Sequence, residues 1–200
     1  MRNAAEGLDL ADSITTDGHK WMNVPYDTGL FFCRKETSMY EVFGPSKATG
    51  PAAYLKPGEG SITSPLFLGI ENSRRFRALP LFCAMMALGR QGYSDLVDRN
   101  ILFARAVADW MMKGEGGKWY LVLNVVDQTV PLNVVLFRTR KVEEDFRKKL
   151  IRRRMVYISE TVSTDGAQAY RLAVSNWMTS MEQDLPVVLE ELRAVMTGWE

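Results

Sequence analysis

The sequence predicts an α/β region followed by a smaller α+β region, and three patterns support this prediction. The continuous apolar run over 28–34 is typical of a strand buried on both faces. Apolar residues at helical spacing over 94–113 predict a long helix with one buried side. After residue 118, short strand-like runs alternate with helical ones. The change at residue 118 therefore separates the two regions.

Composition restricts the function classes that the chain can serve. Apolar residues make up 46% and charged residues 24% of the 200 residues, and the formal net charge is +1. This balance gives no electrostatic basis for binding nucleic acid or an anionic membrane. No apolar run approaches the roughly 18 residues of a membrane span, and residues 1–7 lack the apolar core of a signal peptide. Cys33 and Cys83 lie among apolar residues, which predicts reduced core cysteines in a cytoplasmic protein.

The inventory of reactive side chains excludes several kinds of chemistry. His19 is the only histidine and there are two cysteines, so a closed zinc site of the usual ligands is not expected. Neither a Walker A pattern nor a Gly-x-Gly-x-x-Gly pattern occurs. If the chain is catalytic, Lys20 with a borrowed cofactor is the best candidate.

The stretch 12–29 contains this lysine. A short strand over 12–15 leads through Gly18 to the His19-Lys20 pair. Apolar Trp21, Met22 and Val24 follow, so we expect the lysine amine to lie against packed side chains. Desolvation favours a neutral lysine amine, which can form a Schiff base with an aldehyde cofactor.

The stretch resembles the lysine segment of the group II pyridoxal-phosphate-dependent amino acid decarboxylases. The sequence over 16–20 is most similar to that of the fungal and bacterial members. Three groups of residues carry the resemblance: 11–13, 19–21 and 23–27. Two later segments also match the family, at 70–79 and at 156–177.

The resemblance extends from about Leu8 to Met196 and implies fold type I of the pyridoxal-phosphate enzymes. It implies the C-terminal part of the cofactor-binding large domain over 1–92, a connector helix over 93–117 and a small α+β domain over 118–200. Met1 falls deep inside the family pattern. The family's phosphate loop, ring-stacking histidine and pyridinium-pairing aspartate belong to its upstream half, so we expect a truncated chain.

Residue roles also follow from the resemblance. Lys20 would form the Schiff base with pyridoxal 5'-phosphate. His19 would contact the phosphate or orient the lysine, and the alternative is a packed, hydrogen-bonded ring. Thr15 and Thr16 would donate hydroxyls. Asp17 stands near the phosphate position, where a carboxylate would repel the anion, so we expect it to point away or to bond the turn.

The Gly- and Pro-rich stretch 44–65 predicts a long loop. The resemblance places it where the family has a mobile loop that reaches the partner subunit's active site and carries a proton-donating tyrosine. Tyr54 looks like a neighbouring structural motif and is not assigned this role. Phe67 lies near the expected place.

The second matching segment begins a helix predicted to run from Ser73 to about Arg90, capped by Asn72 or Ser73. Arg74 and Arg75 have two readings: a structural ion-pair cluster, which we favour, or a site for a substrate carboxylate.

Downstream, Gly92 is expected to break the chain before the helix at 94–113. The later predictions are strands at 119–123 and 133–138, a helix at 142–154, a hairpin of 156–159 with 169–174 around an Asp-Gly turn, and a last helix from 184.

Three functions remain in view. The first is an amino acid decarboxylase, a carboxy-lyase that acts as a homodimer or with a full-length relative. The second is an enzyme of the same fold that forms aldehydes or cleaves carbon–carbon bonds. The third is a non-catalytic remnant that dimerises with a full-length relative.

Overall fold

A computed structural model describes residues 5–35, 37–45, 50, 63–71, 73–141 and 145–198. The chain forms two units. One comprises Met1–His19 and Val24–Cys83, and the other comprises Lys20–Asn23 and Ala84–Glu200. The domain boundaries inferred from the resemblance stay predictions.

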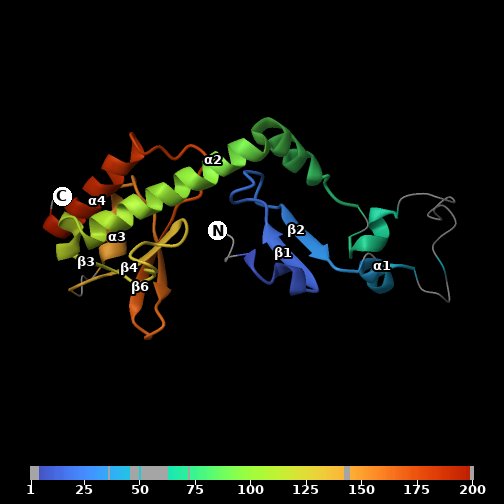
Figure 1. The fold of residues 1–200 in the computed structure, drawn as a ribbon, viewed down its shortest axis with the longest axis horizontal. Coiled ribbons are helices and arrows are strands. Elements are labelled where there is room, and N and C mark those ends of the chain that lie inside the picture. Colours follow the sequence, from blue (N-terminus) through green and yellow to red (C-terminus); the bar gives the residue numbers. More distant parts are fainter. Residues whose placement is uncertain are drawn as a thin grey trace. The chain divides into compact units, whose positions relative to one another are not determined.

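The first unit contains an antiparallel ribbon of two strands, β1 (Ser13–Asp17) and β2 (Gly29–Cys33) (Figure 1). Its register pairs Ser13 with Cys33 and Asp17 with Gly29. Both strands were predicted, with boundaries shifted by one or two residues. Other helices among the described residues of this unit include η2 (Leu8–Leu10), α1 (Ser38–Phe43) and η4 (Pro65–Leu68).

The prediction that β2 is buried on both faces is wrong. Phe31 is 53% exposed and Phe32 is 55% exposed. Among the described residues β2 pairs only with β1, and a two-stranded ribbon has too few neighbours to cover two apolar faces. The two cysteines are not core residues either, because Cys33 is half-buried and Cys83 is exposed.

Helix α2 (Ala78–Met112) differs from the two predicted helices in its start and in its break. It begins at Ala78 rather than Ser73, so Pro80 falls in the first turn, where its missing N–H costs nothing. The interruption lies at Gly89, with φ 60° and ψ −174°, a conformation that favours glycine. Gly92 instead stays helical, and a Cβ there would lie 3.1 Å from the Leu88 Cβ.

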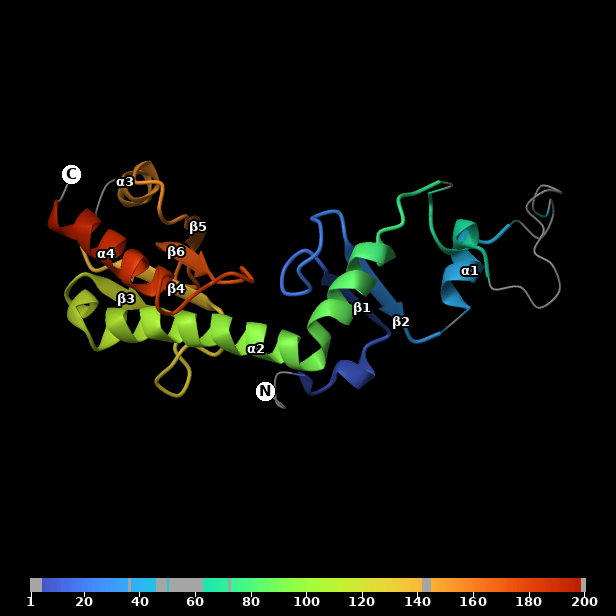
Figure 2. The ribbon, with the colours of Figure 1, turned by 90° about the horizontal axis from the view of Figure 1, so that it is seen from above.

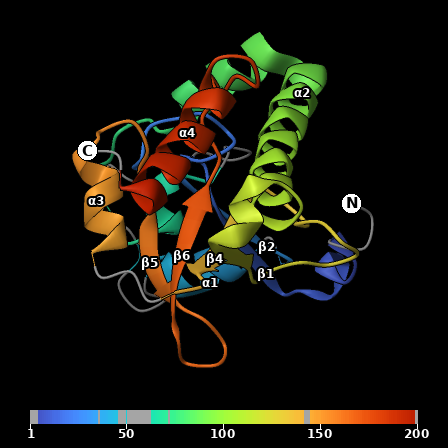
Figure 3. The ribbon, with the colours of Figure 1, turned by 90° about the vertical axis from the view of Figure 1, so that its left-hand side faces the viewer.

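The second unit is an antiparallel sheet covered on one face. Its strand order is β3-β4-β6-β5. The strands are β3 (Tyr120–Val122), β4 (Val134–Thr139), β5 (Ser159–Val162) and β6 (Gln168–Ala173). Figures 2 and 3 show α2, α3 (Phe146–Arg152) and α4 (Asp184–Thr197) gathered on one side of this sheet. A 3-10 helix, η5 (Glu115–Lys118), follows α2.

Most of the predicted downstream elements are confirmed, but the first strand of the hairpin lies at Ser159–Val162 rather than at 156–159. The Asp165-Gly166 turn joins β5 to β6, and the apolar stripe of α2 supplies Ile101, Ala104 and Met111 to the buried side. The predicted helix at 142–154 is shorter: it begins at Phe146 and ends at Arg152. Residues 142–144 lie outside the described residues, and with them the expected pairs of Glu143 and Glu144.

Aromatic rings form the centre of this unit. Tyr120, Phe137 and Phe146 are fully buried and meet edge to face, with the Tyr120 and Phe137 ring centroids 5.5 Å apart. The Tyr120 hydroxyl donates a 2.7 Å hydrogen bond to the Leu192 carbonyl, which fixes α4 above β3.

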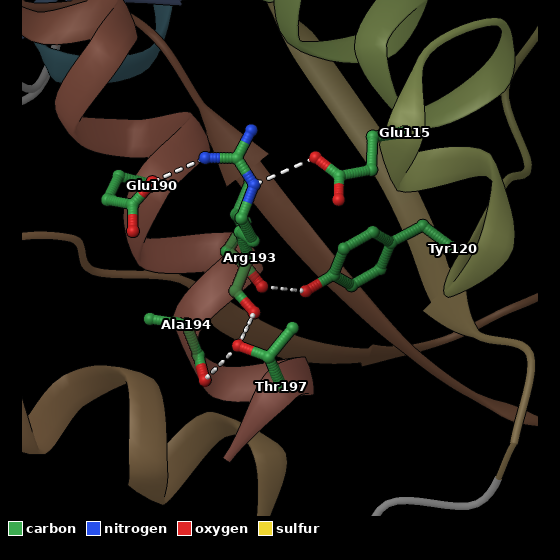
Figure 4. A network of polar contacts seen from close by, with 7 residues as sticks. Glu115, Tyr120, Glu190, Arg193, Ala194 and Thr197 are labelled. Carbon is green, nitrogen blue, oxygen red and sulfur yellow. Dashed lines mark hydrogen bonds and ion pairs between the residues drawn. The ribbon is translucent and has the colours of Figure 1, made fainter. Parts of the chain in front are cut away.

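A polar network closes the same end of the unit (Figure 4). Arg193 of α4 donates from Nε to Glu115 at 2.8 Å and from Nη1 to Glu190 at 2.5 Å. In the same helix, the buried Glu191 accepts hydrogen bonds of 2.5 and 3.2 Å from Arg153, which follows α3. These pairs attach the last helix to two neighbouring elements.

Two absences hold within the described ranges. None of their helices combines the length and apolar character that a bilayer crossing requires. They also contain no group of three or more His, Cys, Asp or Glu side chains arranged to hold a metal ion.

Candidate active site

The chain that leads into Lys20 is tightly packed at Gly18, against Val24 and Thr28. Just after β1, the Gly18 N–H donates a 2.8 Å hydrogen bond to the Thr28 carbonyl and extends the β1–β2 ladder. A Cβ on Gly18 would lie 2.9 Å from Thr28 Cγ2 and 3.0 Å from Val24 Cγ2. Both of those residues are buried. Glycine is therefore required at this position for the turn to close.

The Thr28 hydroxyl, beside Gly18, is buried without a hydrogen-bond partner among the described residues. The residue as a whole is 5% exposed. A buried hydroxyl left unsatisfied costs on the order of 1–3 kcal/mol. A polar group supplied from elsewhere, such as an oxygen of a bound phosphorylated cofactor, fits this site chemically.

His19 is half-buried and its ring packs on Tyr26. The two ring centroids are 4.3 Å apart and the planes are inclined by 38°. The structure thus gives His19 an aromatic partner within the turn. Its predicted contact with a phosphate stays a prediction.

Thr16 and Asp17 are consecutive residues of β1 and both are exposed. They pair with Leu30 and Gly29 of β2. Successive residues of a strand point to opposite faces, so the two side chains do not share a face of the ribbon. This alternation suits the expectation that Asp17 points away from a phosphate that Thr16 would meet.

Lys20 is exposed, so the expectation that its side chain packs against its apolar neighbours is wrong. Those neighbours are directed elsewhere: the Trp21 indole donates to Asn100 Oδ1 at 3.3 Å, and Val24 packs beneath Gly18. The lysine backbone is nevertheless fixed, because the Asn23 N–H donates a 3.0 Å hydrogen bond to the Lys20 carbonyl. Asn23 itself has a φ of 55°. The lysine therefore opens a tight turn.

Two residues near this turn were not predicted. The Tyr93 hydroxyl donates a 3.0 Å hydrogen bond to the Met22 carbonyl, and burial raises the pKa of Tyr93. Asn100 is fully buried within the apolar stripe of α2. A polar residue inside that stripe was the one sequence signal that pointed to Asn100.

The arginine segment binds the end of the lysine segment within the first unit. Asp27 forms ion pairs with Arg77 at 3.3 Å and with Arg75 at 3.7 Å, and Arg77 also pairs with Glu71 at 3.6 Å. Arg74 Nη2 donates to the Pro65 carbonyl at 3.3 Å. These groups are well exposed, so each pair contributes little stability by itself.

The same arginines line an open pocket of about 850 Å³. Other lining residues are Gly29, Ser64 and Glu71. The pocket combines cationic and apolar walls, as a site for a small carboxylate requires. The assignment of Arg74 and Arg75 to a substrate stays a prediction.

The predicted loop falls largely outside the described residues, and Tyr54 with it. Phe67 is described: it is 5% exposed and packs edge to face on Tyr40, with ring centroids 5.9 Å apart. Phe67 is thus a packed residue of η4.

Comparisons with known proteins bear on this site. The family model described as "Pyridoxal-dependent decarboxylase conserved domain" matches residues 1–139. An aromatic-L-amino-acid decarboxylase of Bacillus atrophaeus is 26% identical over 198 residues, covering 92% of this chain and 39% of the relative. A 3,4-dihydroxyphenylacetaldehyde synthase of Drosophila melanogaster is 24% identical over 198 residues, covering 96% and 36%. The chain thus spans less than two fifths of the length of each of these relatives.

Solved structures show the same fold. A crystal structure of Oryza sativa TDC with PLP and tryptamine has a TM-score of 0.81 at 21% identity, covering 98% of this chain and 41% of that one. Tryptophan decarboxylase of Catharanthus roseus, in complex with L-tryptophan, has a TM-score of 0.78 at 17% identity, covering 100% and 41%. These matches confirm the predicted fold class. With the family model matching well over half of its length, this chain belongs to the pyridoxal-dependent decarboxylase family, whose cofactor is pyridoxal 5'-phosphate.

Proposed function

We propose that this chain supplies the lysine of an amino acid decarboxylase active site, with Lys20 as the residue that bonds to pyridoxal 5'-phosphate. The supporting observation is the built turn: Gly18 closes the β1–β2 ladder on Thr28, and Lys20 follows two residues later. That turn lies inside the stretch matched by the family model. Because the relatives are much longer than this chain, the complete site would include residues from outside it.

When bound, pyridoxal phosphate supplies a conjugated ring that accepts the electron pair of the bond to the departing carboxylate. The chain's own residues would hold and orient the reactants. The Lys20 amine would bond to the cofactor's aldehyde carbon, and the Thr16 and Thr28 hydroxyls would donate to phosphate oxygens. His19 would brace the turn through its stacking on Tyr26.

Arg74 is the better candidate of the two arginines for a substrate carboxylate. Arg75 is paired with Asp27, so a substrate would have to compete with that carboxylate. The partner of Arg74 among the described residues is the neutral Pro65 carbonyl. The positive charge of Arg74 therefore remains available at the pocket, which Glu71 also lines.

The proposal includes an amino acid substrate, a cytoplasmic location and a dimer, either of this chain or with a full-length relative. The exposed Phe31 and Phe32 support a larger assembly, because they place an apolar ring on each face of the ribbon, and exposed apolar surface is ordinarily covered by further protein. The net charge of +1 supports a small-molecule substrate rather than nucleic acid.

Reductive trapping tests the assignment. The chain, alone and with a full-length relative, is mixed with pyridoxal phosphate, reduced with borohydride and mapped by peptide mass. We expect the label on Lys20, and we expect Lys20→Ala to lose it. Lys35→Ala is the matched control, because Lys35 is an exposed lysine just beyond β2 and should leave the label unchanged. A label on another lysine, or none in either mixture, would refute the proposal and leave the non-catalytic remnant.

Aldehyde formation is the second candidate, and the Drosophila synthase among the relatives supports it. In that outcome the amino acid consumes one dioxygen and one water and yields the aldehyde, ammonia, hydrogen peroxide and carbon dioxide. Assaying the unreduced assembly, in the mixture that gives the Lys20 label, for amine against aldehyde and peroxide separates the two outcomes.

A further inference from the structure

The segment after Lys20 is attached to α2 at two points within the second unit. The Trp21 indole N–H donates to Asn100 Oδ1 at 3.3 Å, and the Tyr93 hydroxyl donates to the Met22 carbonyl at 3.0 Å. Tyr93 and Asn100 stand seven residues apart, so they lie on one face of the helix two turns from each other. Two consecutive residues of the lysine segment are therefore held by one rigid helical face.

Asn100 also reaches a third part of the chain. Its Nδ2 donates a 3.2 Å hydrogen bond to the Asn176 carbonyl, in the connection that leads from β6 to α4. Asn100 is 0% exposed, so neither half of its amide can turn to water instead. Next to it, Arg99 Nη2 donates to the Trp177 carbonyl at 2.7 Å. One buried amide thus connects the lysine segment, α2 and the connection after β6.

This connection bears on the lysine itself. The Lys20 carbonyl accepts from the Asn23 N–H, so the turn is closed across Trp21 and Met22, the two residues held by α2. If Trp21 and Met22 moved, the turn would open and the Lys20 backbone would lose its fixed direction. The direction of the Lys20 backbone therefore depends on this anchor.

We propose that Asn100, with Tyr93, is a positioning residue: it holds the Trp21–Met22 backbone on α2 and so fixes where Lys20 presents its amine. The role in the reaction rests on the proposed function of Lys20. The positioning itself does not, because it can be measured on the chain without cofactor.

The first measurement is amide hydrogen exchange of Asn23, whose N–H closes the lysine turn. We expect about tenfold faster exchange in Tyr93→Phe, which removes one side-chain hydrogen bond of roughly 1–1.5 kcal/mol. The increase should be at least as large in Asn100→Ala, which removes the bonds to Trp21 and to Asn176. Trp21→Phe, which deletes only the indole donor, should act in the same direction. If Asn100→Ala fails to fold, the Trp21→Phe variant still tests the inference.

Asn124→Ala is the matched control. Asn124 also makes two side-chain hydrogen bonds in the second unit, to the Val134 carbonyl and from the Leu136 N–H, but it does not contact the lysine segment. Its loss should leave Asn23 exchange unchanged. Equal acceleration in Asn124→Ala would mean general loosening and would overturn the inference, as would unchanged exchange in the Asn100, Tyr93 and Trp21 variants.

The second measurement is the rate of borohydride-trapped labelling at Lys20, in the assembly that labels. We expect a rate about tenfold lower in Asn100→Ala, with Trp21→Phe adding little on top because both remove the same bond. An unchanged rate beside accelerated exchange would overturn the role in the reaction. If wild-type Lys20 never labels, the proposed function fails, and the exchange result alone decides whether Asn100 positions the turn.

Discussion

The second unit buries a core of apolar side chains, whereas the strands of the first unit leave Phe31 and Phe32 in contact with solvent. Phe137 of β4 is fully buried among three other aromatic rings, while Phe32 of β2 is 55% exposed. Both residues come from strands of similar apolar character. What differs is the number of layers: β4 has two neighbouring strands and a helical cover, whereas β2 has one described neighbour.

This difference separates two ways of holding a functional residue. The second unit supplies a core of its own, so its elements are fixed by packing. The lysine turn is fixed by a few particular contacts: the Gly18–Thr28 closure in the first unit and the Trp21–Asn100 bond in the second. A turn that is held by such single contacts should respond locally to mutation.

The largest expected effect tests the contrast in burial directly. Phe137→Ala should lower the free energy of unfolding of the second unit by about 3–5 kcal/mol, because it leaves a cavity among Tyr120, Phe146 and Tyr170. Phe32→Ala should change the free energy of unfolding by less than about 0.5 kcal/mol. Urea unfolding followed by tryptophan fluorescence measures both. Equal losses in the two variants would show that Phe32 is buried in solution by some further contact.

A smaller effect tests whether close packing around Gly18 holds the β1–β2 ribbon together. Gly18→Ala should destabilise the β1–β2 ribbon by about 1–3 kcal/mol, because the added methyl meets Thr28 and Val24 at 3.0 Å or less. Amide exchange of the β1–β2 ladder is the measurement.

Gly29→Ala is the control for this change, since a Cβ there meets only the Thr16 carbonyl oxygen, at 4.0 Å. That variant should keep or slightly increase ladder protection, as alanine loses less backbone entropy than glycine. Weakened protection in Gly29→Ala of the same size as in Gly18→Ala would mean that any side chain in the ribbon is harmful, and that the turn is not specially packed.

The elements that the sequence predicted well are those whose signal lies within one element. The apolar stripe of α2 and the Asp165-Gly166 hairpin depend on spacing and turn chemistry that a short window contains. The family resemblance added Lys20, its cofactor and the fold class.

The elements that were mispredicted depend on partners far along the chain. Gly89 and Gly92 are both plausible helix breaks by composition, and only the backbone of the folded chain selects Gly89. Trp21 looked like cover for Lys20, yet its indole bonds Asn100, which is 79 residues away. Asn100 itself carried only the weak signal of a polar residue in an apolar stripe.

The smallest expected effect lies at the hairpin that joins β5 and β6. The Asp165 carboxylate accepts hydrogen bonds from the Ser163 hydroxyl, from the Ala167 N–H at 3.1 Å and from Arg138 at 2.9 Å. These contacts, the Ser163 hydroxyl foremost, lower the pKa of Asp165 to about 2. An unfolded aspartate has a pKa of about 3.9. The folded form therefore gains stability above pH 4, and that gain disappears as the pH falls toward 2.

Asp165→Asn should accordingly flatten the loss of stability of the second unit between about pH 4 and pH 2, leaving the higher-pH behaviour nearly unchanged. Asp98→Asn, at an exposed position of α2, is the control and should not flatten it. The carboxylate is well exposed and screened by solvent, so the change should be smaller than that from Gly18→Ala. If the free energy of unfolding of Asp165→Asn falls as steeply between pH 4 and pH 2 as that of the wild type, the pH dependence comes from other carboxylates. The hairpin would then be held by its Asp-Gly backbone geometry alone.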